Sequence, residues 1–421
     1  MNYAYRYRIH PTESQRETLD HHLDTCRQIY NHTLHELNNI PESAGTVNQR
    51  VNKVIKQLPD LKEWWDELTE LYSTVSQDAA KRVAKNIIRL SGAKQNGLKV
   101  GSLNWKSPRE YQSFTYVQSG FEFDNKNGQT VLSLSKLADI PLSYHRDISE
   151  TVNIKRVTLK REPTGEWYAS FAVDEKEEPA KPDDPQRCVG IDVGILKYAQ
   201  DTDGRAVGFP DLQDNRERLR REQRALSRKE QGSNNWEKQR QTVAEYYQTL
   251  RRKCHDFLHK LSNYYATQYD LVAVEDLDVK SMLKSSGNSR KTAFAAWDTF
   301  TTMLEYKCKR EGTHFVEVEP AGTTKECASC SVETKKPLCV REHSCPACGF
   351  EMDRDANAAI NILSRSFKKL GLGQSEDTTP VETALPMFTS SGSVDVVDGK
   401  RVIESGSPTL HPRGTNRESG E

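Results

Sequence analysis

The amino-acid sequence predicts a multidomain α/β protein, with an antiparallel β-structure and inserted helices in its first half and a mixed sheet in its second half. Three observations lead to this prediction. Short alternating strands occupy 1–10 and 100–177, and helical spacing of apolar residues fills 11–99. From residue 188 onward, apolar strands alternate with long helices. At 421 residues, the chain is long enough for two to four domains.

The charges of the chain balance overall but are unevenly distributed. It contains 60 Lys and Arg and 60 Asp and Glu, so its net charge is zero, which argues against a uniformly basic nucleic-acid binder. Residues 216–260, however, hold 13 basic and 6 acidic residues, a local net charge of +7. Residues 374–421 hold 4 basic and 8 acidic residues, a local net charge of −4, and are rich in Ser, Thr, Gly and Pro. We expect this acidic tail to be disordered.

The cysteines and the apolar segments indicate a protein of the reducing cytoplasm. No apolar run approaches the roughly 20 residues of a membrane helix, so we expect no membrane partner. The opening MNYAYRYRIH is short, alternating and basic, which does not resemble a signal peptide. Nine cysteines are present, and four have the spacing of zinc ligands rather than of a disulfide framework. We therefore expect a cytoplasmic protein, and the nucleic-acid partners considered below make it nucleoid-associated.

The first half begins with an alternating strand at 1–10, followed by a helix that Pro11 and Thr12 introduce. Further helical patterns lie at 45–57, 60–74 and 76–92. This helical insertion is either a solvated bundle or a cradle for nucleic acid. Short strands follow in 100–177, starting at Trp105, and form a small antiparallel barrel or sheet that we expect strand 1–10 to join. Basic and aromatic side chains mix there, and Lys106 and Arg109 are candidate nucleic-acid contacts.

A charged, proline-bearing linker at 174–187 separates the two halves. The strand that follows, 188–193, is apolar except for Asp192, and a buried Asp is unfavourable unless it binds something cationic. A later apolar strand, 269–277, carries Glu275 near its end. The remaining predicted elements are an amphipathic helix at 292–311, a strand at 314–318 and a helix at 355–369.

Two long basic helices lie between these strands, at 212–265, with a break at 232–235. Basic runs are usually solvated helix faces, but the excess of positive charge here favours contact with nucleic acid. The candidate contacts are Arg216, Arg220, Arg224, Arg228, Lys229, Arg251, Arg252 and Lys260.

Four cysteines predict a zinc ribbon at 327–348. They form two CxxC pairs, Cys327 with Cys330 and Cys345 with Cys348, with fourteen residues between the pairs. This spacing fits one tetrahedral Zn²⁺ with four thiolate ligands, and a site without an open position is structural rather than catalytic. Cys339 lies inside the ribbon but has no CxxC partner.

Three carboxylates, Asp192, Glu275 and Asp355, are candidate catalytic residues. They are 83 and 80 residues apart, so only the fold can bring them together. Acids on a first strand, a later strand and a following helix are what a ribonuclease-H-type sheet needs to hold two Mg²⁺ ions, which prefer oxygen ligands. We expect Asp353 to cap the last helix rather than join the site. For Asn357, both a ligand-orienting role and a plain helix-surface position remain open.

Several motifs together resemble the TnpB (OrfB) proteins of insertion sequences. They are GIDVG at 190–194, ALSRKEQGSNNWEKQR at 225–240, HDFLHKLS at 255–262, VAVEDL at 272–277, the two CxxC pairs and DRDANAAINI at 353–362. The opening segment also matches one that is often described in this family as a helix-turn-helix, and the match covers about 370 residues in order. The tail resembles that of haloarchaeal members.

The resemblance implies a RuvC-like nuclease core at 188–326 and 349–373, and a wedge β-barrel at 1–10 and 100–177. It also implies that 11–99 is a helical recognition lobe inserted in that barrel. The expected partners are a guide RNA encoded by the element and double-stranded target DNA, and the expected cofactors are one structural Zn²⁺ and two catalytic Mg²⁺. By position, Asp192, Glu275 and Asp355 match the catalytic carboxylates of the family, with Asp192 shared between the two metal ions.

Three functions remain compatible with these patterns. The leading hypothesis is an RNA-guided, Mg²⁺-dependent DNA endonuclease of the transposon. The alternatives are an RNA-guided repressor that does not cut DNA, which the three intact carboxylates disfavour, and a transposase-family DNA-binding protein acting in DNA recombination. A zinc-ribbon adaptor would leave Asp192 and Glu275 unexplained. The oligomeric state is left open.

Overall fold

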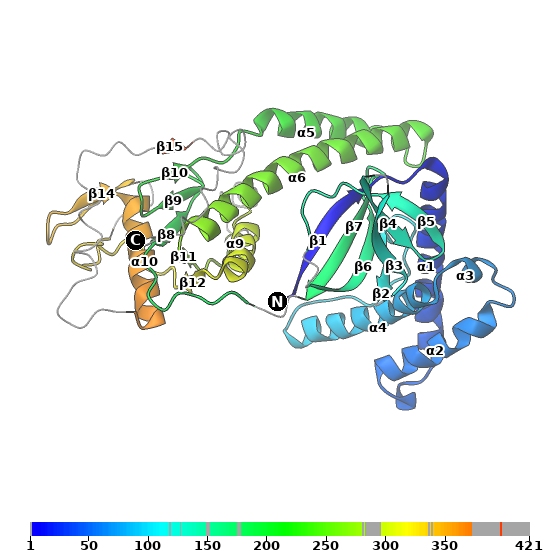
Figure 1. Ribbon diagram of the computed structural model, residues 1–421. Coiled ribbons are helices and arrows are strands. Elements are labelled where there is room, and N and C mark those ends of the chain that lie inside the picture. Colours follow the sequence, from blue (N-terminus) through cyan, green and yellow to red (C-terminus); the bar gives the residue numbers. More distant parts are fainter. Residues whose placement is uncertain are drawn as a thin grey trace, which may run out of the picture. The chain divides into compact units, whose positions relative to one another are not determined.

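The computed structural model describes residues 2–372 except 118, 127, 149–151, 175–177, 280–281, 283–295, 336 and 338–339, and in addition Val396 and Val397. The chain divides into two compact units, Met1–Glu177 and Glu178–Glu421. The mixed α/β composition, with several sheets, agrees with the predicted fold class (Figure 1). In the described part of the chain, no helix combines the length and the apolarity needed to cross a bilayer.

The first unit contains two antiparallel sheets. Four strands form the larger sheet, in the order β1 (Asn2–Ile9), β7 (Trp167–Asp174), β6 (Asn153–Arg161) and β2 (Ser113–Val117). The smaller sheet contains β3 (Phe121–Lys126), β4 (Gln129–Leu134) and β5 (Leu137–Pro141). Strand β1 pairs with β7 along its whole length, as the sequence predicted, and its alternation buries Tyr7 and Ile9 in the core of the unit.

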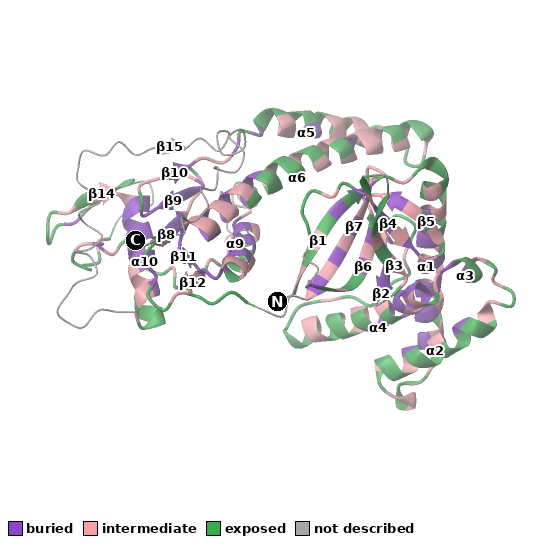
Figure 2. Cartoon of the chain, in the orientation of Figure 1, coloured by how far each residue is buried: buried purple, intermediate pink, exposed green. Residues whose placement is uncertain are grey.

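The helices of the first unit are α1 (Glu13–Asn39), the 3₁₀ turn η1 (Glu42–Ala44), α2 (Val47–Leu61), α3 (Glu67–Glu70) and α4 (Ser73–Gln95). Helix α1 begins at a capping box, because Thr12 Oγ1 accepts from Gln15 N and the Gln15 side chain accepts from Thr12 N. Apolar residues of these helices belong to one buried cluster with residues of both sheets, and Figure 2 shows both buried and exposed residues along the helices.

Two sequence predictions for this unit were wrong. The helix expected at 60–74 is interrupted: α2 ends at Leu61, α3 is a single turn and α4 begins at Ser73, while Leu68 and Leu71 are buried all the same. The strand expected at Trp105 and Lys106 is absent, and 105–112 form no strand. The backbone N–H and C=O of Lys106 instead bond to the side-chain amide of Asn31 on α1, at 2.8 and 3.0 Å, so a sheet partner is not needed.

The second unit is built on a mixed sheet with the order β12-β11-β8-β9-β10-β15. Strands β8 (Cys188–Val193), β11 (Leu271–Glu275) and β12 (His314–Val318) are parallel. Strands β9 (Ala199–Asp201) and β10 (Ala206–Val207) continue the sheet in antiparallel fashion from β8, and β15 (Val396–Val397) pairs with β10. Apart from β15, the tail 374–421 that was expected to be disordered lies outside the described residues.

Helices cover both faces of this sheet. On one face, α6 (Asn234–Gln268) and α9 (Trp297–Glu311) pack their aromatic and aliphatic residues against alternate side chains of β8 and β11. On the other face, α10 (Arg354–Leu370) packs against Leu271 and Ala273 of β11 and against Val316 and Val318 of β12. Helix α5 (Gln213–Ser227) lies against α6. The helix predicted at 292–311 begins at Trp297, and 292–295 lie outside the described residues.

The contact between β8 and α10 requires a glycine. A Cβ atom at Gly190 would lie 2.2 Å from the carbonyl oxygen of Ala359 and 2.9 Å from the backbone nitrogen of Leu363. Backbone atoms cannot move aside as a flexible side chain can, so only glycine permits this close approach. The backbone of β8 therefore lies directly on α10, two residues before Asp192.

Candidate functional site

Asp192, Glu275 and Asp355 come from the three elements that meet at this contact. Asp192 lies in β8 and Glu275 is the last residue of β11. These strands are parallel and pair Ile191 with Val274, so the two carboxylates follow at neighbouring positions of the same sheet edge. Asp355 lies in the first turn of α10, which packs on β8. Each of the three residues is 8% exposed, so the fold places three largely buried carboxylates on adjoining elements.

Burial and mutual repulsion make negative charge unfavourable at this place. Burial raises the pKa of Asp192 well above its ordinary value, and the neighbouring charges of Glu275 and Asp355 raise it further. Burial also raises the pKa of Glu275, although the hydrogen bond from Thr323 and the positive charge of Arg365 oppose this shift. Carboxylates in this situation are stabilised by a bound cation. The donor set consists of hard oxygen atoms, which fit Mg²⁺.

Protein side chains hold two of the three carboxylates. Thr323 Oγ1 donates a hydrogen bond to Glu275 Oε1. Asp355 Oδ1 accepts from Arg354 Nη2 at 3.2 Å and from Arg341 Nη1 at 3.5 Å. Among the described residues, the side chains that lie together as candidate metal ligands are four cysteines, and the three carboxylates do not form such a group. The two guanidinium groups thus neutralise Asp355 at its place on α10.

Asp353 serves as the N-cap of α10, as the sequence predicted. Its Oδ1 atom accepts from the backbone nitrogens of Asp355 at 3.0 Å and Ala356 at 3.2 Å. Its other oxygen forms an ion pair with Lys197 at 2.9 Å. The capping interaction fixes the first turn of the helix and with it the backbone of Asp355.

Two asparagines connect α10, the helix that carries Asp355, to residues 323–328, where the cysteine segment 327–348 begins. Asn357 Oδ1 accepts from Ala328 N at 3.0 Å, and Asn357 Nδ2 donates to Glu326 O at 2.8 Å. Asn361 Nδ2 donates at 2.8 Å both to Glu326 O and to Thr323 O. Thr323 is the residue that bonds Glu275. Asn357 is fully buried, so its side chain positions this segment and is not a helix-surface amide.

Sequence reasoning missed Thr323, Asn361 and the two arginines at Asp355. One available signal was the four-residue spacing of Asn357 and Asn361, which places both amides on one face of α10. For Thr323 no local signal exists, since its partner lies 48 positions earlier in the chain.

Replacing Thr323 with valine is expected to reduce the catalytic activity that the sequence predicts for the carboxylates, without unfolding the protein. Valine keeps the shape of the side chain but cannot donate to Glu275, whose buried carboxylate loses its hydrogen bond. The activity should fall about tenfold, in line with the loss of one charge-assisted hydrogen bond. Single-turnover assays of phosphodiester hydrolysis, the chemistry predicted for the carboxylates, measure this effect, and Thr324→Val is the control. Equal rates for native protein and Thr323→Val would contradict the positioning role of Thr323.

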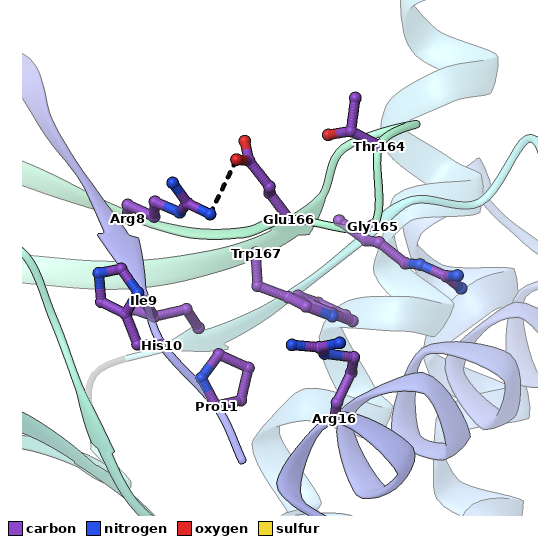
Figure 3. Close-up of a pocket in the computed structure, with 10 residues that line it drawn as sticks. Arg8, Ile9, His10, Pro11, Arg16, Thr164, Gly165, Glu166 and Trp167 are labelled. Carbon is purple, nitrogen blue, oxygen red and sulfur yellow. Dashed lines mark ion pairs between the residues drawn. The ribbon is translucent and has the colours of Figure 1, made fainter. Parts of the chain in front are cut away.

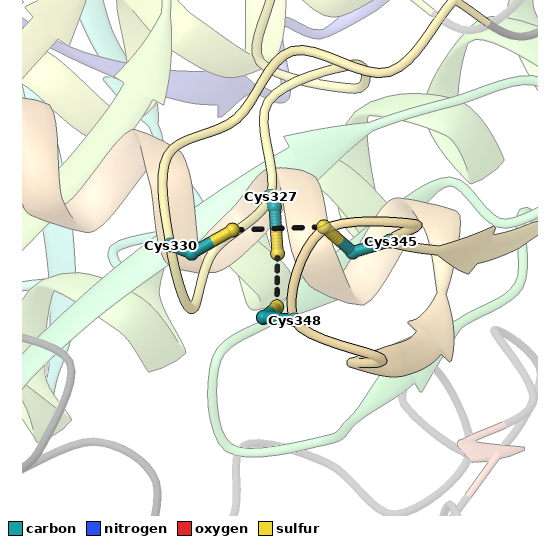
Figure 4. A group of neighbouring side chains, drawn as sticks. All are labelled: Cys327, Cys330, Cys345 and Cys348. Atoms are coloured by element: carbon teal, nitrogen blue, oxygen red, sulfur yellow. Dashed lines mark hydrogen bonds between the residues drawn. The ribbon is translucent and has the colours of Figure 1, made fainter.

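The four cysteines of the predicted ribbon gather at one point (Figure 4). The ligand atoms of Cys327, Cys330, Cys345 and Cys348 all lie within 4.8 Å of one another. Cys327 Sγ is 3.7 Å from Cys348 Sγ, and Cys330 Sγ is 3.5 Å from Cys345 Sγ. A short hairpin of β13 (Glu342–Ser344) and β14 (Glu351–Asp353) carries the second pair. Cys339 lies outside the described residues.

The chemistry of these thiols suits a thiophilic metal ion. The backbone N–H groups of Cys348 and Ala347 lower the pKa of Cys345 to about 6, so this sulfur is readily present as a thiolate. Burial raises the pKa of Cys327 to about 12. A buried thiol among other sulfurs becomes a ligand when a cation replaces its proton. Four sulfur atoms in one cluster fit Zn²⁺ in a structural role.

The candidate nucleic-acid contacts of the second unit lie on α5, on α6 and between them. Arg220, Arg224, Arg228, Arg251 and Arg252 are exposed, whereas Arg216, Lys229 and Lys260 are half-buried. Lys260 pairs with Asp256 at 3.0 Å. In the first unit, Arg109 is exposed and Lys106 is half-buried. The exposed arginines are accessible to a polynucleotide backbone.

Three family profiles match the chain. One described as a helix-turn-helix domain covers residues 1–43, where the structure has β1, the single helix α1 and the start of η1. One described as "Probable transposase" (OrfB, IS605) covers 170–286, and one described as a Cas12f1-like TNB domain covers 297–362. Together these profiles span both halves of the chain and include all three carboxylates and all four cysteines of the cluster.

Individual relatives cover most of the chain. A Streptomyces pristinaespiralis protein named "Putative RNA-guided DNA endonuclease" is 32% identical over 368 residues, which is 86% of this chain and 88% of the relative. The Escherichia coli K12 protein "Putative RNA-guided DNA endonuclease InsQ" is 27% identical over 88% of this chain and 94% of its own. A cryo-EM structure of a Cas12f1–sgRNA–target DNA complex has a similar fold, with a TM-score of 0.57, 16% identity and 83% of each chain covered.

Proposed function

The chain belongs to the TnpB (OrfB) family, and from this premise we propose that it is a transposon-associated, RNA-guided DNA endonuclease. One observation supports the proposal most strongly. Asp192, Glu275 and Asp355, from β8, β11 and α10, form a largely buried group in which burial and like charges raise the pKa of Asp192. Relatives that cover most of this chain are named RNA-guided DNA endonucleases.

The three carboxylates would hold divalent cations, with Asp192 between Glu275 and Asp355. Bound Mg²⁺ would supply an activated water and would stabilise the charge of the leaving oxygen during phosphodiester hydrolysis. The chain itself supplies the orientation of the ligands. Thr323 fixes the Glu275 carboxylate, Asp353 fixes the helix turn that carries Asp355, and the burial of all three excludes competing bulk water.

The finer fold assignments belong to the same proposal. We assign the second unit, apart from the cysteine segment 327–348 and the tail, to a RuvC-like core, and the two sheets of the first unit to a wedge domain. The helices between β1 and β2 would form the recognition lobe, and the cysteine cluster a structural zinc ribbon. Guide RNA and double-stranded target DNA are the proposed partners, since sequence selection by base pairing leaves the protein to contact backbones. The protein would act in the cytoplasm, at the nucleoid.

The exposed arginines near the junction of α5 and α6 are expected to bind RNA backbone. Replacing Arg224 and Arg228 together with alanine should weaken RNA binding about tenfold at moderate salt. The slope of log Kd against log salt should fall by about 1.4, since each lost contact with a single strand contributes roughly 0.7. A salt series of filter-binding measurements tests this expectation.

The matched control is Lys309→Ala with Arg310→Ala on α9, which removes the same charge from the same unit. If both double variants showed the same salt slope, the assignment of RNA contact to the α5–α6 junction would be wrong.

The proposed function is tested with the RNA that copurifies with the protein. Sequencing should give one defined transcript from the end of the chain's own gene. The complex should then cut a duplex that matches the guide segment in the presence of Mg²⁺, and leave a duplex with a scrambled match intact. A defined RNA without cleavage by the native protein would favour the repressor. Absence of any specific RNA would favour a transposase-family DNA-binding protein.

A further inference from the structure

A cavity of about 360 Å³ opens in the first unit, where the end of β1, the start of α1 and the turn between β6 and β7 come together. Its charged lining residues are Arg8, Arg16, Arg161 and Glu166. The volume falls within the range of pockets that bind small ligands. The lining carries three guanidinium groups and one carboxylate, and Asp20 pairs with Arg161 beside it. None of these residues belongs to the carboxylate site or the cysteine cluster.

The one carboxylate of the lining is already satisfied by protein groups. Glu166 forms an ion pair with Arg8 at 2.8 Å and accepts a hydrogen bond from the Tyr168 hydroxyl at 3.0 Å. Arg161 pairs with Asp20 at 3.0 Å but keeps further N–H donors on its guanidinium. Arg16 is exposed, and its guanidinium lies close enough to Asp20 to interact with that carboxylate electrostatically. Three guanidinium groups thus stand against two carboxylates, Glu166 and Asp20, so one net positive charge and further N–H donors remain at the cavity.

A buried donor points to the same kind of ligand. Trp167 lines the cavity and is 1% exposed, yet its indole Nε1 has no hydrogen-bond partner within the described residues. Unpaired buried N–H groups are rare in folded proteins, and each requires an explanation. Figure 3 shows the side chains of Trp167, from the start of β7, and Arg16, from the first turn of α1, pointing toward one another. A ligand between them must accept hydrogen bonds and carry negative charge.

We propose that this cavity binds a phosphate group of a polynucleotide strand. Guanidinium groups and a neutral N–H together match the oxygens of a phosphate, for which arginine is the preferred side chain. Arg16 and Arg161 hold the charged oxygens, Trp167 Nε1 donates to one of them, and the remaining volume admits the adjoining sugar. The inference rests on the proposed function only in naming a polynucleotide as the source of the phosphate.

The test follows the indole N–H signal of Trp167 in two-dimensional ¹H–¹⁵N spectra of the full chain, freed of copurifying nucleic acid. The signal is identified by its absence from Trp167→Phe. If Trp167→Phe does not fold, the Trp167 signal is identified instead as the indole N–H signal whose position changes in Arg16→Gln. The probes are inorganic phosphate and mixed-sequence RNA or DNA of about ten nucleotides without a terminal phosphate. Both probes should shift the signal downfield in a saturable way.

Arg16→Gln should weaken this binding about tenfold, because one charge-assisted contact is lost. Arg156→Gln, an exposed arginine of the same sheet outside the cavity, should leave it unchanged. A signal that no probe shifts would overturn the proposal. A shift with inorganic phosphate that neither RNA nor DNA produces would make the cavity a free-anion site and overturn the polynucleotide assignment. This binding test does not measure DNA cleavage, so its outcome does not depend on whether the protein is a nuclease.

Discussion

Asp192→Asn is expected to abolish DNA cleavage and, at the same time, to raise the melting temperature of the protein freed of divalent cations. Cleavage should fall by at least about 10³-fold, since loss of a metal ligand removes several kcal/mol of transition-state stabilisation. Stability should rise because burial and the charges of Glu275 and Asp355 disfavour the Asp192 carboxylate in the folded state. Asparagine occupies the same space without a charge.

The gain in stability should depend on pH in a defined direction. Folding raises the pKa of Asp192 above its ordinary value of 3.8. Below pH 3.8 the side chain is protonated in both the folded and the unfolded protein, and its contribution to stability is fully present. As the pH rises toward the pKa of the folded protein, the unfolded chain ionises first, and this contribution is lost. The advantage of Asp192→Asn should therefore grow with pH from about 4 upward and reach roughly 2–4 °C near neutrality, the shift that about 1 kcal/mol produces in a domain of this size.

Thermal melts in a chelating buffer across this pH range, together with cleavage assays, check both effects. The control is Asp276→Asn, an exposed carboxylate directly after Glu275, which should change neither cleavage nor stability. An Asp192→Asn protein that melts at or below the native temperature at every pH would show that the carboxylate group is not under electrostatic strain.

Cys345→Ser is expected to remove zinc and to inactivate the nuclease although it lies outside the carboxylate site. Structural zinc contributes about 10–16 kcal/mol in small zinc domains, so loss of one ligand should release the ion and loosen the segment it holds. That segment is tied to α10 by the bonds of Asn357 to Glu326 O and Ala328 N. The effect therefore reaches the residues that orient Glu275 and Asp355.

Atomic absorption should find one zinc per native chain and about a tenth or less in Cys345→Ser, since thiolate affinity far exceeds that of a serine hydroxyl. Cys254→Ser, a cysteine of α6 outside the cluster, should keep its zinc and its activity. Full cleavage by zinc-depleted Cys345→Ser would mean that the cysteine segment does not support the carboxylate site.

Much of the candidate site was readable from the sequence because its chemistry is carried by local patterns. An Asp inside an apolar strand, a Glu at the end of another and the CxxC spacings each stand out without knowledge of the fold. The structure brings the four cysteines together as predicted, and Asp353 caps α10 as expected, while zinc binding by the cluster stays a proposal. The catalytic and nucleic-acid roles of the named residues remain predictions.

The remaining features depend on contacts between distant parts of the chain. Thr323 bonds Glu275, and Arg341 contacts Asp355 across fourteen positions, although neither residue lies in a recognisable motif. Similarly, Lys106 satisfies its backbone through the side chain of Asn31, so its local strand pattern was misleading. Local propensity yields to tertiary packing at such places.

The most direct test of the central claim is to count the divalent cations that the carboxylate group binds. Zinc-loaded protein would be titrated with Mn²⁺, which binds oxygen ligands as Mg²⁺ does, and free Mn²⁺ would be followed by electron paramagnetic resonance. We predict about two saturable Mn²⁺ per native chain and loss of this binding in Asp192→Asn. Identical Mn²⁺ binding by the native protein and Asp192→Asn would contradict the claim that Asp192, Glu275 and Asp355 form the metal site of a nuclease.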